Sequence, residues 1–161
     1  MFTARECIYI ALALVLSGCQ QPTVPNPSSD AEAEIKVVSD RAHQICANPK
    51  YAAFYSKTAC RGDQVTFEQI ADTSTISPKA KAIFFEVRAK QDAINSEWAN
   101  LLRKHGGTAG SKRASAYEAS IQAQNQNNLD LYNGQITWGE YNKRRQLLDR
   151  EYHAATFGTT S

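Results

Sequence analysis

The 161-residue chain lacks the features that mark several large classes of protein. Its formal net charge is only +2, and its densest basic run, Lys143 to Arg145, is three residues long. Such a weak positive excess gives no electrostatic footprint for nucleic acid, so we expect no nucleic-acid partner. No segment alternates apolar and polar residues over the length of a β-strand. These absences favour an all-α fold.

The sequence motifs of common enzymes are also missing. The chain has no H-E-x-x-H, no G-x-S-x-G and no G-x-x-x-x-G-K-[ST], the signatures of zinc proteases, serine hydrolases and phosphate-binding loops. Its three histidines, His43, His105 and His153, fall on or at the ends of different predicted helices. We therefore predict that the protein is not an enzyme and has no catalytic residues, cofactor or metal.

One continuous apolar run is present, near the N-terminus. Residues 8–15 read IYIALALV, which is the length of a signal-peptide apolar region and too short to span a bilayer. Leu16, Ser17, Gly18 and Cys19 follow. This segment resembles the lipobox of bacterial lipoproteins, in which two small residues fit the signal peptidase and the cysteine sulfur receives the lipid.

The resemblance to bacterial lipoproteins implies a cellular location. Residues 1–18 would be removed as a signal peptide, and Cys19 would become the lipid-carrying first residue, with fatty acyl chains such as palmitate. In that family an aspartate after the cysteine retains the protein at the inner membrane. Gln20 stands there in this chain, which implies an outer-membrane anchor facing the periplasm. Two or more acyl chains are enough for stable anchoring.

The segment after the anchor is rich in proline and small polar residues. It contains Pro22, Pro25 and Pro27 among Ser, Asn and Thr, a composition typical of an extended or disordered tether. We therefore divide the chain into the signal peptide, a lipidated tether over residues 19–30 and a helical domain over residues 31–161.

Four cysteines are present, and two of them remain for the folded domain. Cys7 leaves with the signal peptide and Cys19 carries lipid, so Cys46 and Cys60 are left. In an oxidising compartment they most simply form one disulfide, which closes a loop of about 15 residues and stabilises the fold by ~3 kcal/mol. A zinc site with His43 is the weaker alternative, because no second pair of ligands is present.

Apolar residues recur at helical spacing along most of the remaining chain. We expect two or three long helices with shorter ones between them, at residues 30–47, 78–105, 113–133 and from Thr137 to about residue 153. Short helices should follow Asn48-Pro49 and the capping box that begins at Thr66. Residues 106–112, GGTAGSK, are predicted to be a flexible connector. The polar stretch IQAQNQNN, residues 121–128, is predicted to face solvent, with polar contacts to a partner as the alternative.

Residues 129–148 carry a second, local resemblance. Their pattern is a leucine, a glycine turn, Ile-Thr, an acidic-aromatic pair, two arginines and two leucines, here Leu131, Gly134, Ile136, Thr137, Glu140, Tyr141, Arg144, Arg145, Leu147 and Leu148. This pattern resembles the short C-terminal helical hairpin abbreviated SHOCT, although Trp138 and Gly139 replace its usual acidic residues. The resemblance implies an interaction or self-association element, with Trp138, Tyr141, Arg144 and Arg145 as candidate contact residues. The aromatic stripe from Trp138 to Tyr152 is also typical of plain core packing.

Together these patterns predict a membrane-anchored envelope lipoprotein without enzymatic activity. The leading interpretation is an accessory or protein-interaction module whose partners are other envelope proteins or a second copy of the chain. One alternative is a binder of a periplasmic small molecule or cell-wall fragment that uses Trp98, Trp138 and neighbouring tyrosines. The other is a lipoprotein component of a secretion or conjugation apparatus.

Overall fold

The computed structural model describes residues 29–157, so the predicted signal peptide, Cys19 and most of the tether lie outside the described residues. All regular elements in the described part are helical, which confirms the all-α prediction. In chain order they are α1 (Ser29–Cys46), η1 (Pro49–Tyr51), α2 (Ala52–Tyr55), η2 (Gly62–Gln64), α3 (Phe67–Ala71), α4 (Pro78–Tyr132) and α5 (Trp138–Phe157).

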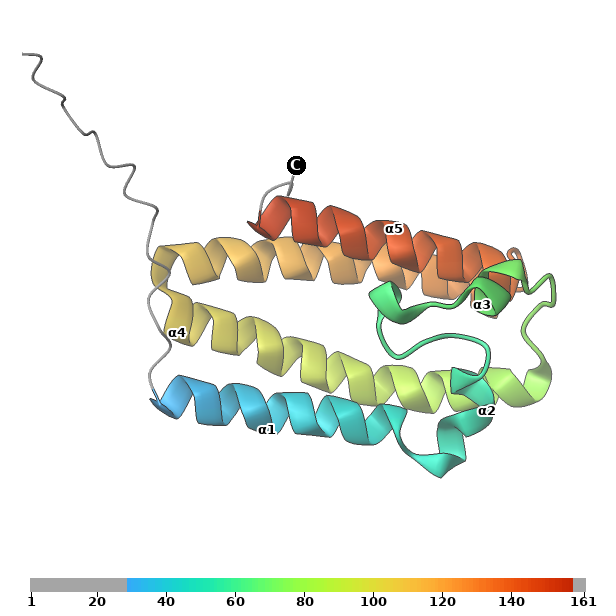
Figure 1. Ribbon diagram of the computed structural model, residues 1–161, viewed down its shortest axis with the longest axis horizontal. Helices are drawn as coiled ribbons and strands as arrows, with labels where there is room; N and C mark the ends of the chain where they lie inside the picture. Colours follow the sequence, from blue (N-terminus) through green and yellow to red (C-terminus); the bar gives the residue numbers. More distant parts are fainter. Residues whose placement is uncertain (1–28, 158–161) are drawn as a thin grey trace, which may run out of the picture.

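Helix α4 is a hairpin of two antiparallel arms. The chain reverses at Gly107, whose φ of 54° and ψ of −141° interrupt the helix, and the two arms then run side by side (Figure 1). Arg103 of the first arm pairs with Glu118 of the second at 2.5 Å. A positive φ is easily adopted by glycine because it has no Cβ, so Gly107 allows the tight reversal.

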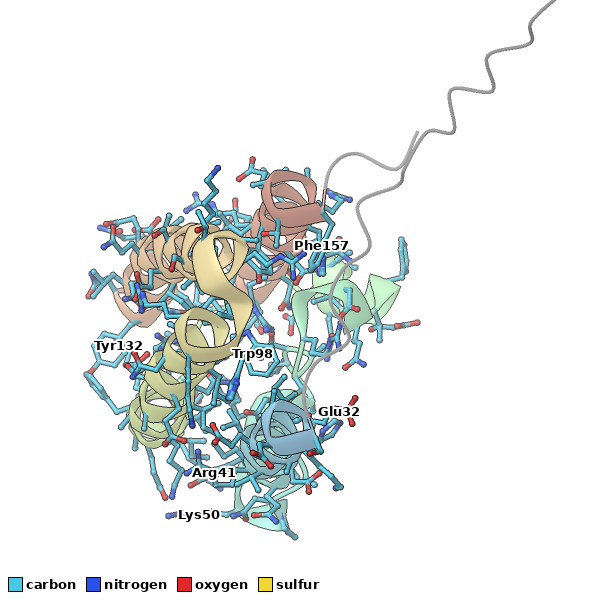
Figure 2. The ribbon with its side chains drawn as sticks, turned by 90° about the vertical axis from the view of Figure 1, so that its left-hand side faces the viewer. Glu32, Arg41, Lys50, Trp98, Tyr132 and Phe157 are labelled. Atoms are coloured by element: carbon cyan, nitrogen blue, oxygen red, sulfur yellow. A yellow bond between two sulfur atoms is a disulfide. The ribbon has the colours of Figure 1, made fainter. Side chains whose placement is uncertain are left out.

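The other two long helices flank this hairpin. Helix α1 lies along the first arm, where Glu34 accepts a hydrogen bond from Lys104 at 2.5 Å. Helix α5 lies along the second arm, where Arg144 pairs with Asp130 at 2.6 Å. The four long segments alternate in direction, and an end-on view shows them surrounding a common interior (Figure 2). This is the up-down-up-down arrangement of a four-helix bundle.

The apolar core occupies the end of the bundle away from the Gly107 turn. Phe54 of α2 is at its centre, with its ring 5.8 Å from that of Phe84 and 5.6 Å from that of Trp138, both edge-on. The buried cluster comprises Tyr51, Phe54, Ile76, Phe84, Val87, Leu131, Ile136, Trp138 and Tyr141. Edge-to-face aromatic pairs stabilise beyond their buried area alone, so this end fixes the spacing of the helices.

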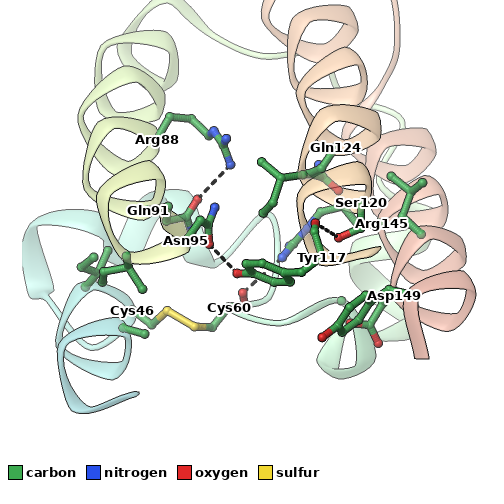
Figure 3. A pocket seen from close by; sticks show the side chains of 17 residues that line it. Cys46, Cys60, Arg88, Gln91, Asn95, Tyr117, Ser120, Gln124, Arg145 and Asp149 are labelled. Atoms are coloured by element: carbon green, nitrogen blue, oxygen red, sulfur yellow. Dashed lines mark hydrogen bonds between the residues drawn. A yellow bond between two sulfur atoms is a disulfide. The ribbon is translucent and has the colours of Figure 1, made fainter. Parts of the chain in front are cut away.

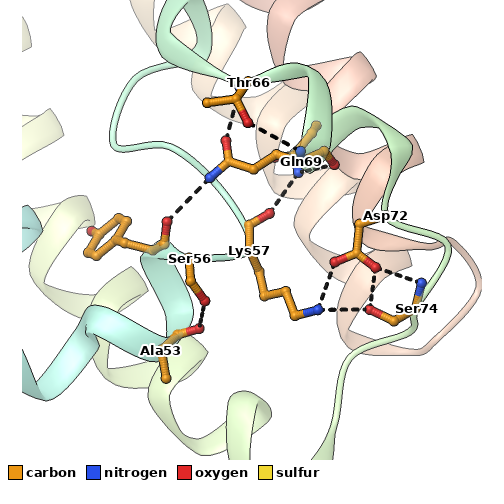
Figure 4. A network of polar contacts seen from close by, with 9 residues as sticks. Ala53, Ser56, Lys57, Thr66, Gln69, Asp72 and Ser74 are labelled. Carbon is orange, nitrogen blue, oxygen red and sulfur yellow. Dashed lines mark hydrogen bonds and ion pairs between the residues drawn. The ribbon is translucent and has the colours of Figure 1, made fainter.

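The connector between α1 and α4, residues 47–77, crosses the open side of the bundle. Asn48 caps η1 through Lys50 N, and the Cys46–Cys60 disulfide ties the connector to α1. The predicted capping box at Thr66 is confirmed, with Gln69 as its partner. Lys57 binds Asp72 at 2.8 Å, and Asp72 also accepts from Ser74 (Figure 4). The connector is therefore a bonded part of the domain.

The predicted helix boundaries are confirmed at their caps. The Ser77 side chain caps the start of α4 by accepting from Ala80 N. Gly134, with a φ of 71°, follows the end of α4, and Thr137 and Glu140 form the reciprocal capping bonds at the start of α5. Each of these helix ends is set by a capping or glycine residue that can be recognised in the sequence.

The prediction of a flexible connector over residues 106–112 is wrong. Only the Gly107 backbone leaves the helical region, and residues 108–112 already belong to the second arm. A Cβ at Gly110 would stand 2.0 Å from the carbonyl oxygen of Leu102. Gly107 therefore serves the reversal and Gly110 a close approach between the two arms, whereas composition alone indicates flexibility.

We predict that Gly110→Ala destabilises the domain, because the new methyl group forces the arms apart beside the turn. The expected loss in free energy of unfolding is about 1–3 kcal/mol, the usual cost of overpacking. Gly106→Ala is the matched control, since a Cβ there meets nothing within 4 Å. Urea denaturation of both variants measures the difference, and equal stabilities would contradict the packing described here.

An internal polar cavity as the candidate functional site

A cavity of about 290 Å³ lies in the middle of the bundle. Its walls come from α1, both arms of α4, α5 and the connector, and the Cys46–Cys60 disulfide forms part of one side (Figure 3). The apolar lining comprises Ala42, Ile45, Ile94, Ile121 and Leu148. The volume is near the lower end of the ~300–1,000 Å³ typical of small-molecule sites.

Polar side chains from the two arms of α4 face each other across this cavity. The first arm contributes Arg88, Gln91 and Asn95, which share one helix face because they are three and four residues apart. Tyr117, Ser120 and Gln124 contribute in the same way from the second arm. The Tyr117 hydroxyl donates to Asn95 Oδ1 at 2.7 Å (Figure 3). The middle of the bundle is thus lined by hydrogen-bonding groups.

Arg88 is largely buried and has a counterion. Its side chain is 15% exposed, and its Nη2 donates to Asp92 at 2.6 Å and to Asn125 at 2.7 Å. Asp92 lies one helical turn further along the same arm and is itself exposed. The charge of Arg88 is therefore balanced within the domain, although its guanidinium remains in the cavity wall.

Arg145 of α5 lies in the same wall with neutral partners. Its Nη1 donates to Thr58 Oγ1 and to the Ala59 carbonyl, both at 2.6 Å, and its Nη2 donates to the Cys60 carbonyl at 3.1 Å. No carboxylate within residues 29–157 forms an ion pair with it. Of the cavity-lining residues Asp149 alone is acidic, and its carboxylate is 3.8 Å from His153.

Two tyrosines complete the polar lining. The rings of Tyr117 and Tyr152 pack edge-on with centroids 5.6 Å apart. Burial, with a smaller contribution from neighbouring Tyr152, raises the pKa of Tyr117 to about 12, and burial also raises the pKa of Tyr152. Both phenols are therefore neutral at physiological pH and able to donate a hydrogen bond.

Asn142 anchors the connector beneath the cavity. This side chain is fully buried and accepts from Thr58 Oγ1 at 2.6 Å, while its Nδ2 donates to the carbonyls of Lys57 at 2.8 Å and Gln69 at 3.0 Å. Thr58 in turn accepts from Arg145. A continuous hydrogen-bonded chain thus runs from Arg145 through Thr58 to Asn142. Sequence reasoning missed it, because its partners are more than 70 residues apart.

The structure separates the four candidate contact residues of the 129–148 hairpin. Trp138 is 1% exposed and Tyr141 is 4% exposed, so both belong to the core, in agreement with the core-packing reading of the aromatic stripe. Arg144 is exposed and pairs with Asp130. Arg145 points inward to the connector. Of the four residues, Arg144 alone is freely exposed at the surface.

The prediction that residues 121–128 face solvent is wrong for part of the stretch. Asn127 and Asn128 are buried. Asn127 donates to the Tyr141 carbonyl at 3.1 Å, and Asn128 accepts from the Tyr141 hydroxyl at 3.0 Å. Gln124 lines the cavity. Tyr141 of α5 supplies one hydrogen-bond partner to each buried asparagine, whereas Asn127 Oδ1 and Asn128 Nδ2 have no partner among the described residues.

The predicted disulfide is confirmed, and it excludes Cys46 and Cys60 as zinc ligands while it is intact. Within residues 29–157 no group of three His, Cys, Asp or Glu side chains could hold a metal ion. The same residues include no helix long and apolar enough to cross a membrane. Comparison of the chain with family models, curated proteins and solved structures finds no match.

Proposed function

We propose that the protein is a lipid-anchored small-molecule-binding protein of the bacterial envelope. The observation that carries this proposal is the cavity of about 290 Å³ between the four helical segments and the connector, which is partly open to solvent and lined by both polar and apolar side chains. Ligand sites in helix bundles form in the core from side chains on facing helices. The second interpretation of the sequence, a binder of a periplasmic small molecule or wall fragment, is thereby favoured over the first.

The lining chemistry suits binding better than catalysis. The Ser120 hydroxyl donates to the Tyr117 carbonyl, and no histidine lines the cavity to act as its base. Nucleophilic catalysis needs a nucleophile and a base within hydrogen-bond reach of each other. What the cavity offers is a set of fixed donors and apolar walls, which can recognise a molecule without changing it.

The proposed location at the outer membrane is inferred from the sequence. Leu16, Ser17 and Gly18 before Cys19 support lipidation, and the proline-rich segment that follows supports a tether between lipid and domain. In this proposal the anchor keeps the domain at the outer membrane, where the cavity samples periplasmic solutes.

A second candidate function is contact with another envelope protein. Phe85 and Leu129 are 61% and 54% exposed, and the Phe85 ring packs edge-on against Tyr132 at 4.7 Å. Exposed apolar side chains that lie together favour a protein interface. Crosslinking in cells, with Phe85→Ser as the variant that removes the interface, separates this candidate from ligand binding. A secretion or conjugation apparatus is one setting for such a contact.

We predict that Cys19→Ala abolishes anchoring and signal-peptide removal, because no other side chain supplies the sulfur that carries the lipid. Membrane fractionation should show the wild-type protein in the outer membrane with a mass that includes acyl chains. The variant should lack this acyl mass and keep residues 1–18. Acylation of the variant, or a wild-type protein free of lipid, would contradict the anchor.

We predict that Ser120→Phe removes a ligand that copurifies with the wild-type protein. The phenyl ring enters the cavity from the second arm of α4, whereas Ser115→Phe adds the same ring on the exposed side of that arm and is the control. Native mass spectrometry of all three proteins isolated from cells measures the bound mass. A small molecule held equally by all three, or by none, would refute the proposed function.

A further inference from the structure

We infer that the ligand of this cavity is an anion, a carboxylate or phosphate on a polar molecule the size of a single sugar, and that Arg145 binds the anionic group. This inference rests on the proposed function, since it names the chemical class that the cavity selects. The observations that carry it are the unbalanced charge of Arg145, the part of its guanidinium that remains free, and the composition of the opposite wall.

Within residues 29–157 the charge of Arg145 has no ion-pair partner. Its partners are a hydroxyl and two carbonyls, and the cavity-lining Asp149 forms no ion pair with it. Arg88, the other cation in the wall, is balanced by Asp92. A partly buried cation without a counterion is costly, and an anion that enters the cavity would relieve that cost.

The hydrogen-bonding state of Arg145 leaves a suitable edge open. A guanidinium has five N–H donors, and the three bonds to Thr58, Ala59 and Cys60 use both Nη1 hydrogens and one on Nη2. The Nε hydrogen and the second Nη2 hydrogen have no acceptor within the described residues. These two neighbouring donors form the side-on fork that binds carboxylates and phosphates bidentately.

The protein also fixes the direction of the guanidinium before any ligand arrives. Thr58 is itself held by Asn142, and both side chains are fully buried. Arg145 therefore loses little side-chain freedom on binding, which is the main benefit of preorganisation. An arginine held by carbonyls in this way has the same role as one held by a carboxylate, but it keeps its full charge for the ligand.

The remaining lining suits a hydroxylated body. Tyr117 and Asn95 present a phenol and an amide on opposite arms, paired with each other at 2.7 Å, and both side chains carry groups that can hydrogen-bond ligand hydroxyls. The disulfide and Leu148 supply apolar contact beside Arg145. The volume of about 290 Å³, near the lower end of the ~300–1,000 Å³ typical of ligand sites, suits a body of about one sugar unit.

The test compares matched probes on the full lipidated protein in detergent. Isothermal titration calorimetry with D-glucuronate, D-glucose 6-phosphate and D-glucose keeps the sugar body nearly constant and changes the charge. We expect at least one of the two acids to bind about tenfold or more tightly than glucose, in line with a charged bidentate contact. The better acid identifies carboxylate or phosphate as the preferred group.

Two neighbouring arginines supply the variants. Arg145→Gln should remove the preference for the acid, whereas Arg144→Gln should retain it, because Arg144 is exposed and paired with Asp130 outside the cavity. Circular dichroism melting checks the fold of each variant. Should Arg145→Gln fail to fold, Arg145→Lys decides the question, since it keeps the charge but loses the fork and should weaken acid binding without changing glucose binding.

The outcomes separate this inference from the proposed function. Acids that bind no more tightly than glucose, or a preference that survives in the Arg145 variants, would overturn the anionic ligand while leaving a neutral one in the cavity. Absence of acid binding also overturns the anionic ligand. Whether the cavity binds any ligand is decided separately by native mass spectrometry, which shows whether a small molecule copurifies with the wild-type protein but not with Ser120→Phe.

Discussion

A set of buried hydrogen bonds from one turn of α5 to the connector holds the domain in its observed shape. Asn142 binds the backbone at Lys57 and Gln69 and the side chain of Thr58, and Arg145 binds the next residues along, through Cys60. The disulfide continues this attachment to α1. The connector thereby joins α1 and α5, the first and last helices of the bundle.

This attachment explains how a polar cavity persists inside a small helical domain. Apolar packing around Phe54 closes one end of the bundle, and the Gly107 reversal with its close approach at Gly110 closes the other. Between these two ends the connector, residues 47–77, is held by hydrogen bonds and the disulfide and keeps the helices apart. A continuous apolar core would bring the helices closer together. Buried polar groups are costly unless they are bonded, and most of those around the cavity are.

The secondary structure was predictable because its signals are local. Asn48-Pro49, the Thr66 capping box, Ser77-Pro78 and the Asn133-Gly134 stop each act through a few adjacent residues, and all occur where the sequence indicates. The disulfide followed from counting the cysteines that remain for the folded domain if Cys7 leaves with a signal peptide and Cys19 carries lipid. Chemistry contained within one turn of chain can be read without knowing the fold.

The cavity was not predictable, because its residues are brought together only by tertiary packing. Arg144 and Arg145 look alike as parts of one basic run, yet a helix turns about 100° per residue, so one faces solvent and the other the interior. Asn127 and Asn128 look solvent-exposed until α5 provides their partners. Glycines at 106, 107 and 110 suggest flexibility by composition, whereas the role of Gly110 depends on the carbonyl of Leu102, eight residues away.

Hydrogen–deuterium exchange of the wild-type protein and Asn142→Leu tests most directly whether these bonds hold the connector. Leucine has the same branching and number of side-chain heavy atoms but leaves Thr58 and the carbonyls of Lys57 and Gln69 without their partner, and Asn100→Leu on an exposed position is the control. We expect amides in residues 57–72 of Asn142→Leu to exchange faster while α1 and α4 stay protected. Unchanged protection of that segment would contradict it.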